Sequence, residues 1–172
     1  MKASVFIATS LDGYIARKNG GLDWLPENGG EPHGYDEFIA SIDAIVIGRM
    51  TYETVLGFET WPYGEKAVIV LSDSLAGVHP PPSARCKLMH GRPRDLMLEF
   101  EKMGLQHLYI DGGITIQRFL QEGLIQTLTI TRIPVILGAG ISLFGPSDRD
   151  IRFTHVATRT YPSGMVQSEY RA

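Results

Sequence analysis

The segment 44–54, AIVIGRMTYET, joins an apolar run to the first turn of a predicted helix. A helix N-terminus carries unpaired backbone N–H groups and about half a positive charge, so it attracts anions. Glycine at Gly48 lets a phosphate approach the backbone, and Arg49 adds a permanent, forked cation. With Met50 and with Thr51, which can cap the helix or donate to the anion, this turn is a candidate phosphate site. The alternative is a simple strand-to-helix turn with a surface arginine.

A second glycine turn, Gly112-Gly113 in YIDGGITIQ, also lies between an apolar run and a predicted helix. Its backbone could hold a pyrophosphate. One such turn is common in α/β proteins, but two of them suit a dinucleotide, which has phosphates in two places. The segment 137–145, LGAGISLFG, is not a further site, because Leu143 stands where the dinucleotide fingerprint requires its third glycine.

Other kinds of catalytic site find little support in the sequence. The five histidines show no paired ligand spacing, and Cys86 is the single cysteine, so no metal site is expected. Ser10, Ser72 and Ser74 lack the context of a nucleophile elbow, which argues against a hydrolase of that type.

The elements that would position the two glycine turns alternate along the chain. Short apolar runs that end in Gly, Ser or Asp predict buried strands, and apolar residues spaced three and four apart predict helices. This alternation indicates an α/β fold with a largely parallel central sheet. The predicted strands are 3–8, 45–48, 66–72 and 105–113, and the predicted helices are 34–42, 49–56, 92–104 and 114–124.

The C-terminal part of the chain has a different pattern. Segments 125–136, 150–162 and 165–172 read as successive strands with no helix between them, so the sheet should finish with antiparallel strands. The segment 79–83, HPPPS, is interpreted as a loop and not as a linker between domains. We expect one domain over residues 1–172.

Composition narrows the class of protein. One cysteine excludes an internal disulfide and fits a reducing compartment. No run approaches the roughly 18 apolar residues of a membrane helix, and the N-terminal apolar run is too short for a secretory signal. The net charge is −3 and the sequence has no block of Lys and Arg, so it lacks the basic patch that is typical of nucleic-acid-binding proteins. These features predict a cytoplasmic protein that acts on small molecules.

Six segments, FIATSLDGYIA, GLDWL, IVIGRMTYE, VIVLS, LYIDGG and TITRIPVILGAGISLF, occur in an order that resembles a known family. It is the reductase domain of bacterial bifunctional deaminase-reductases of riboflavin synthesis, and the chain is also similar, more distantly, to dihydrofolate reductase. The resemblance extends from about Ala3 to Tyr170 and implies a three-layer dihydrofolate reductase-like fold. The zinc pattern of a deaminase half, His-x-Glu with Cys-x-x-Cys, does not occur in the sequence.

The resemblance implies that NADPH lies across the sheet. By the matching motifs, Ala8 and Ile15 would flank the nicotinamide, and Gly48 to Thr51 would lie at the adenosine-side phosphates. Ser72 would approach the ribose 2′-phosphate, and Asp111 to Thr115 would hold the pyrophosphate. The implied cofactor contacts are Ala8, Ile15, Gly48, Arg49, Met50, Thr51, Ser72, Asp111, Gly112, Gly113, Ile114 and Thr115.

The resemblance also implies a substrate pocket and a proton source. Dihydrofolate reductases have a carboxylate on the first helix, for which Asp36 and Glu37 are the nearest matches, although both could form a solvated helix face. Asp12 is the other candidate, although Asp-Gly is also a common turn pair. The implied substrate contacts are Thr9, Trp24 and Thr131, of which Trp24 could equally belong to the core.

The predicted function is that of a reductase which passes a hydride from NADPH to a small heterocycle of the pterin or ribosylamino-pyrimidine type. The alternatives are a nucleotide-binding protein without turnover and a dimeric interaction module. Arg49 and Ser72 would favour NADPH, whereas Asp73 would oppose its extra phosphate. Alternating apolar residues near the C-terminus, on a late edge strand, predict a homodimer.

Overall fold

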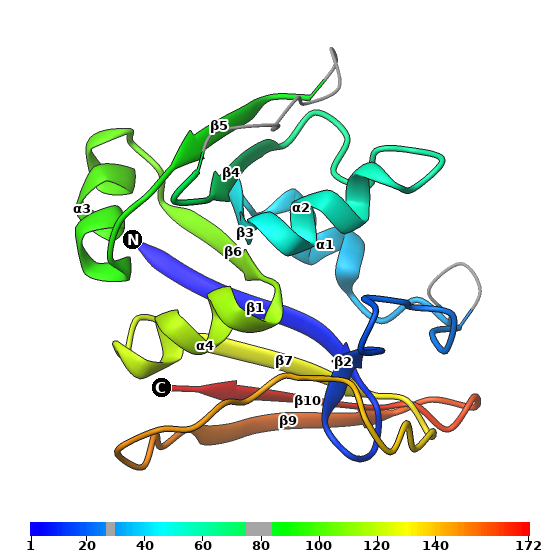
Figure 1. Cartoon of the computed structure of the whole chain (residues 1–172). Helices are drawn as coiled ribbons and strands as arrows, with labels where there is room; N and C mark the ends of the chain where they lie inside the picture. Colours follow the sequence, from blue (N-terminus) through cyan, green and yellow to red (C-terminus); the bar gives the residue numbers. More distant parts are fainter. Residues whose placement is uncertain (27–29, 75–83) are drawn as a thin grey trace.

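The computed structural model describes residues 1–26, 30–74 and 84–172. Eight strands form one sheet in the order β5-β4-β3-β6-β1-β7-β10-β9 (Figure 1), and β2 pairs separately with β8. The strands are β1 (Lys2–Thr9), β2 (Tyr14–Ala16), β3 (Ala44–Gly48), β4 (Ala67–Leu71), β5 (Cys86–Met89), β6 (His107–Asp111), β7 (Thr127–Arg132), β8 (Ile141–Ser142), β9 (Thr154–Thr160) and β10 (Val166–Arg171).

The sheet is the middle one of three layers, because both faces of its central strands are covered. Along β3, Ala44 and Val46 pack into a core cluster with helices α3 and α4, whereas Ile45 and Ile47 pack with α1 and α2. This alternation follows from the two-residue period of a strand. The helices are α1 (Tyr35–Ala40), α2 (Arg49–Leu56), α3 (Pro93–Lys102) and α4 (Gly113–Gln121).

The prediction of a mostly parallel sheet with antiparallel C-terminal strands is confirmed. Every pairing from β5 through β4, β3, β6 and β1 to β7 is parallel. Strand β10 then pairs antiparallel with both β7 and β9. The chain therefore inserts its last strand between β7 and β9 and leaves β9 at the edge of the sheet.

Three strands were not among the predicted ones. Strands β2 and β8 contain only three and two residues, too few for a periodic pattern to be visible. Strand β5 is at the other edge of the sheet and reads CKLM, with a charged residue among apolar ones. The loop predicted for 79–83 lies outside the described residues.

The topology gathers strand ends at one place. Because β3, β6 and β1 are parallel neighbours, their carboxyl ends meet at the same edge of the sheet. Helix α2 starts directly after β3, and α4 starts directly after β6. Both helix N-termini therefore lie at this edge, where open α/β sheets bind ligands. No helix in the described ranges is long and apolar enough to cross a membrane.

Candidate functional site

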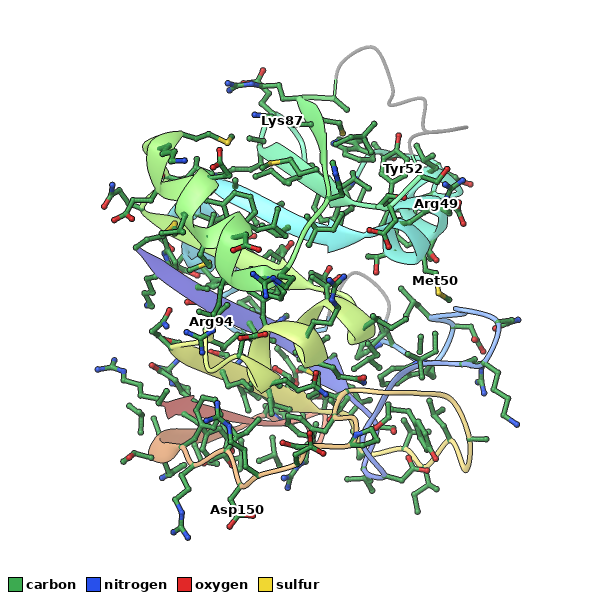
Figure 2. The ribbon with its side chains drawn as sticks, turned by 60° about the vertical axis from the view of Figure 1, so that its left-hand side comes forward. Arg49, Met50, Tyr52, Lys87, Arg94 and Asp150 are labelled. Atoms are coloured by element: carbon green, nitrogen blue, oxygen red, sulfur yellow. The ribbon has the colours of Figure 1, made fainter. Side chains whose placement is uncertain are left out.

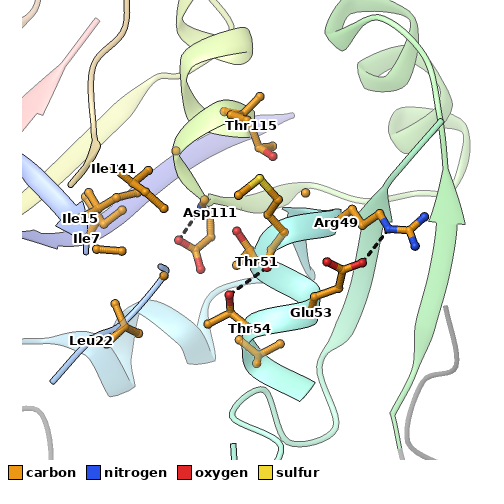
Figure 3. Close-up of a pocket in the computed structure, with 18 of the residues that line it drawn as sticks. Ile7, Ile15, Leu22, Arg49, Thr51, Glu53, Thr54, Asp111, Thr115 and Ile141 are labelled. Carbon is orange, nitrogen blue, oxygen red and sulfur yellow. Dashed lines mark hydrogen bonds and ion pairs between the residues drawn. The ribbon is translucent and has the colours of Figure 1, made fainter. Parts of the chain in front are cut away.

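A cavity of about 870 Å³ opens at the carboxyl ends of the parallel strands. Its lining combines the ends of β1, β3, β4 and β6, the first turns of α2 and α4, and the segment from β2 to Leu25. Figure 3 shows Asp111 in the middle of this lining, with Ile7 and Ile15 on one side and Thr51 and Arg49 on the other. Cavities that bind cofactors and small ligands have a similar volume.

The two glycine turns interlock at the floor of this cavity. A β-carbon at Gly48 would lie 2.8 Å from Oγ1 of Thr115, and one at Gly112 would overlap Oγ1 of Thr51. Gly112 also has a φ of +89°, which side-chain-bearing residues rarely adopt. Each turn therefore leaves just enough room for the threonine of the other helix.

The first turns of both helices offer donors to the cavity. Gly48 and Gly112 occupy the N-cap positions and have no side chain to cap the first N–H groups. Those groups and the helix dipoles create a positive potential at both turns. This is the arrangement that suits the phosphates of a dinucleotide.

Arg49 and Ser72 meet beside the first turn of α2. The guanidinium of Arg49 donates to the Ser74 carbonyl at 3.2 Å, and the Ser72 hydroxyl donates to the same carbonyl at 2.7 Å. Arg49 also forms an ion pair with Glu53, with 2.7 Å between Nε and Oε1. Asp73 lines the cavity as well, so one wall of this region is acidic.

Asp111 is the carboxyl group in the middle of the cavity. It is half-buried, and this burial raises the pKa of the carboxyl, whereas hydrogen bonds from the Gly112 N–H and the Tyr63 hydroxyl act in the opposite direction. The bond from Gly112 is 2.7 Å long and the one from Tyr63 is 3.4 Å long. Burial, together with the charge of Asp111, also raises the pKa of Tyr63, which keeps its hydroxyl protonated as a donor.

The cavity is apolar beyond Asp111. Helix α2 crosses the site, so that Arg49 at its start and Val55 in its last turn line different parts of the cavity. We call the part around both glycine turns, Arg49 and Ser72 the nucleotide end of the cavity. The part beside Val55 is called the far end. We assign to the far end the apolar lining residues after β2 and those from the last turn of α2 and the segment after it, together with Tyr63: Leu22, Leu25, Val55, Phe58, Pro62 and Tyr63.

All the cofactor contacts predicted from the sequence lie in the lining of this one cavity. It includes Ala8 and Ile15, the turn from Gly48 to Thr51, Ser72, and the turn from Asp111 to Thr115. The structure thus brings together residues from five separate parts of the sequence. Their contact with a cofactor stays a prediction.

The structure places the predicted proton donors of the first helix elsewhere. Asp36 and Glu37 are exposed on α1, and neither lines the cavity. The apolar side of α1 faces the sheet through Phe38 and Ile39, so the two carboxylates point to solvent. Their geometry fits the solvated helix face that the sequence left open.

Asp12 lies in the loop between β1 and β2, outside the cavity, where its hydrogen bonds connect two loops. Its carboxylate accepts hydrogen bonds from the Ser10 hydroxyl at 2.6 Å and from the N–H groups of Leu137 and Gly138 at 3.1 and 2.8 Å. These bonds, the one from Ser10 first, lower the pKa of Asp12 and keep it ionised. Asp12 and Thr9 line a separate, smaller pocket and not the cavity.

The remaining predicted substrate contacts are not in the cavity either. Thr131 is buried and accepts a hydrogen bond from the Gln167 amide at 3.1 Å. Trp24 is half-buried and is absent from the lining, whereas its neighbours Leu22 and Leu25 belong to it. Within the segment GLDWL, Leu22 and Leu25 therefore line the cavity, whereas Trp24 does not, and the substrate contacts stay predictions.

Sequence reasoning missed several lining residues. Tyr63 and Phe58 follow α2 in a segment without a recognisable pattern, so no local signal identified them. Thr54 and Val55 could have been found, since they lie three and four residues after Thr51 and share its face of the helix. Within the described residues there is no group of three or more His, Cys, Asp and Glu side chains that could hold a metal ion.

Comparisons with known proteins identify relatives over the whole chain. The model of the RibD C-terminal domain family matches residues 2–167. The Bacillus subtilis protein YwjB is 34% identical over 177 residues, which cover 99% of this chain and 98% of YwjB.

Solved structures show the same fold. A Shewanella sp. PV-4 protein named for riboflavin biosynthesis has a TM-score of 0.91 and 39% identity, covering 99% of this chain and 98% of its own. The deaminase/5-amino-6-(5-phosphoribosylamino)uracil reductase of Thermotoga maritima has a TM-score of 0.74 at 18% identity, covering 99% of this chain and 56% of its own. Dihydrofolate reductase from Enterococcus faecalis, complexed with NADP(H), has a TM-score of 0.69 at 19% identity, covering 99% of this chain and 95% of its own.

Proposed function

The chain belongs to the RibD C-terminal domain family, and on this premise we propose that it is a reductase that uses NADPH to reduce a small heterocyclic substrate. The observation that carries the proposal is the convergence of both glycine turns, Arg49 and Ser72 on one cavity. This arrangement fits a nicotinamide dinucleotide, because two helices begin at one cavity and the N–H groups of their first turns could bind phosphates in two places.

The residues that would hold the cofactor lie at the nucleotide end. The first turns of α2 and α4 would bind its phosphates through backbone N–H groups. Arg49 and Ser72, which already point to one carbonyl oxygen, would hold the 2′-phosphate by moving their hydrogen bonds from Ser74. Ala8 and Ile15 would flank the nicotinamide with apolar surface.

The protein's own chemical contribution is a proton and a dry, fixed environment. When bound, the reduced nicotinamide supplies a hydride, which together with one proton converts a carbonyl or imine double bond into a single bond. Asp111 is the group best placed to donate that proton, since its carboxyl lies in the cavity and burial raises its pKa. Tyr63 would hold the carboxyl in position through its hydroxyl.

The proposal is tested by turnover with pterins and ribosylamino-pyrimidines, followed through the loss of reduced-nicotinamide absorbance. A general acid contributes typically about 10²–10⁴-fold, so Asp111→Asn should lower kcat by that range. Asp36→Asn and Glu37→Gln are matched controls, and both should retain the wild-type rate. Tight NADPH binding without turnover of any substrate would favour the alternative of a non-catalytic nucleotide-binding protein.

A further inference from the structure

We propose that the far end of the cavity takes an uncharged ring of pyrimidine or pterin size that carries no phosphate group. This inference rests on the proposed reductase function, because it assigns the nucleotide end of the cavity to the cofactor. The class of substrate is inferred from the side chains of the far end, which the cofactor would leave free.

The far end is lined mainly by hydrocarbon. Leu22 and Leu25 come from the segment after β2, whereas Val55, Phe58 and Pro62 come from the last turn of α2 and the segment after it. A flat ring gains free energy when it is buried between such side chains. A phosphate there would lose its hydration without receiving a compensating partner.

Three basic side chains line the cavity, and two of them are at the nucleotide end. Arg49 is paired with Glu53 and also contacts the Ser74 carbonyl. Arg118 lies on α4 and donates to a backbone carbonyl oxygen at 3.1 Å. The third, Lys18, is exposed in the segment after β2.

The other basic residues of the chain are bound or positioned elsewhere. Arg17 is held by Asp23 through bonds of 2.7 and 2.9 Å, and Arg132 lines the smaller pocket. Figure 2 shows Lys87 and Arg94 well away from Arg49. The segments 27–29 and 75–83, outside the described residues, contain no Lys or Arg in their sequence.

The charge balance of the lining leads to the same conclusion. The three basic side chains are balanced by the carboxylates of Glu53 and Asp73, and Asp111 is the protonated donor in the proposed function, so the described lining has an excess of only one positive charge. A dinucleotide already brings several negative charges to the nucleotide end. A second phosphorylated molecule would add charge to a site whose remaining cation, Lys18, is exposed, and an ion pair formed in solvent contributes little to binding.

The polar groups at the boundary of the far end suit the edge of a heterocycle. Asp111 and Tyr63 present a carboxyl and a hydroxyl side by side, 3.4 Å apart. Ring N–H and carbonyl groups can pair with both. A site that hydrogen-bonds a ring edge discriminates strongly against analogues without those groups.

A matched pair of compounds tests the inference. Binding of 5-amino-6-(5-phosphoribosylamino)uracil and of its dephosphorylated form is measured by calorimetry, with and without saturating NADP⁺. We expect the dephosphorylated compound to bind at least tenfold more tightly, and kcat/KM to follow the same order. Equal binding, tighter binding of the phosphorylated compound, or binding of neither would overturn the inference. A separate NADPH titration tests the proposed function, so the two failures are distinguishable.

Two variants show where a phosphate would bind. Phe58→Lys introduces a cation at a position that is 42% exposed, and it should improve binding of the phosphorylated compound at least tenfold, whereas Phe58→Leu should not. Lys18→Ala should leave the ratio between the two compounds unchanged. A selective loss of the phosphorylated compound in Lys18→Ala would show that Lys18 holds a substrate phosphate, and would overturn the inference.

Discussion

The hydroxyl of Tyr63 lies 3.4 Å from Oδ2 of Asp111, in the wall of a cavity that two glycine turns and an arginine also line. Tyr63 belongs to the segment after α2, and Asp111 is the last residue of β6. The contact therefore connects the segment after α2 to a central strand of the sheet. It gives a half-buried carboxyl one donor besides the neighbouring backbone N–H.

The raised pKa of Asp111 predicts a pH dependence of stability. Below the unfolded pKa of about 3.9, the carboxyl is protonated in both the folded and the unfolded state. As the pH rises toward the higher folded pKa, the unfolded chain loses its proton first, so the free energy of unfolding falls. Asp111→Asn removes this titration, and denaturation from about pH 4 to about pH 7 should show the variant gaining stability relative to the wild type.

The exposed Asp36 provides the control for this experiment. Asp36→Asn should not show the gain in stability expected of Asp111→Asn, because Asp36 is exposed and lies outside the cavity. A constant difference between the wild type and Asp111→Asn across the same range would contradict the account of Asp111.

Arg49 is predicted to select NADPH over NADH. A hydrogen bond to a charged group contributes about 1.5–3 kcal/mol, so Arg49→Ala should weaken NADPH binding by about ten- to a hundredfold. NADH, which lacks the 2′-phosphate, should lose little. Asp73 lines the same region, and Asp73→Asn should strengthen NADPH binding because it removes a repelling charge. Equal losses of both cofactors in Arg49→Ala would place Arg49 at phosphates that they share.

The interlocked turns predict a specific cost for a methyl group at Gly112. Gly112→Ala should destabilise the fold through the positive φ, by about 1–3 kcal/mol, and further through overlap with Thr51. Gly104→Ala is the matched control, because Gly104 has a φ of +78° and open space around its β-carbon position. Urea denaturation should show a larger loss for Gly112→Ala, and similar losses for both variants would argue against close packing of the turns.

The sequence was sufficient for the features that local rules determine. Runs such as 45–47 and 67–71 are apolar throughout because both faces of these strands are covered, and that made them recognisable. The turns at Gly48 and Gly112 were recognisable because a glycine follows each strand directly before a helix. In the structure both glycines are needed, since a threonine side chain lies where a β-carbon would be.

Features that depend on side-chain direction could not be predicted in this way. Trp24 and Leu25 are adjacent, yet only Leu25 reaches the cavity. Asp12 was assigned to the loop correctly, but its hydrogen bonds to Leu137 and Gly138 connect residues more than a hundred positions apart. Such pairings arise from the packing of the whole fold, and a single sequence carries no local signal for them.

The edge strand β9 predicts a homodimer. Its residues are almost all exposed, and β10 pairs with one side of it only. An exposed edge with unpaired backbone groups invites another strand, and a second copy of this chain is the partner we expect. Sedimentation at micromolar concentration should give a dimer, and Thr158→Pro in β9 should shift it toward monomer. A monomeric wild type would contradict this prediction.

The central claim is that the cavity binds a reduced nicotinamide dinucleotide at the two glycine turns. Fluorescence titration of the purified protein with NADPH tests it most directly and needs no knowledge of the substrate. The account predicts saturable binding with a Kd of about 1 μM to 1 mM, the range of typical KM values. It also predicts strong weakening in Gly48→Val, whose side chain would collide with Thr115 and cover the first turn of α2. No saturable binding of NADPH or NADH by the folded wild type would contradict it.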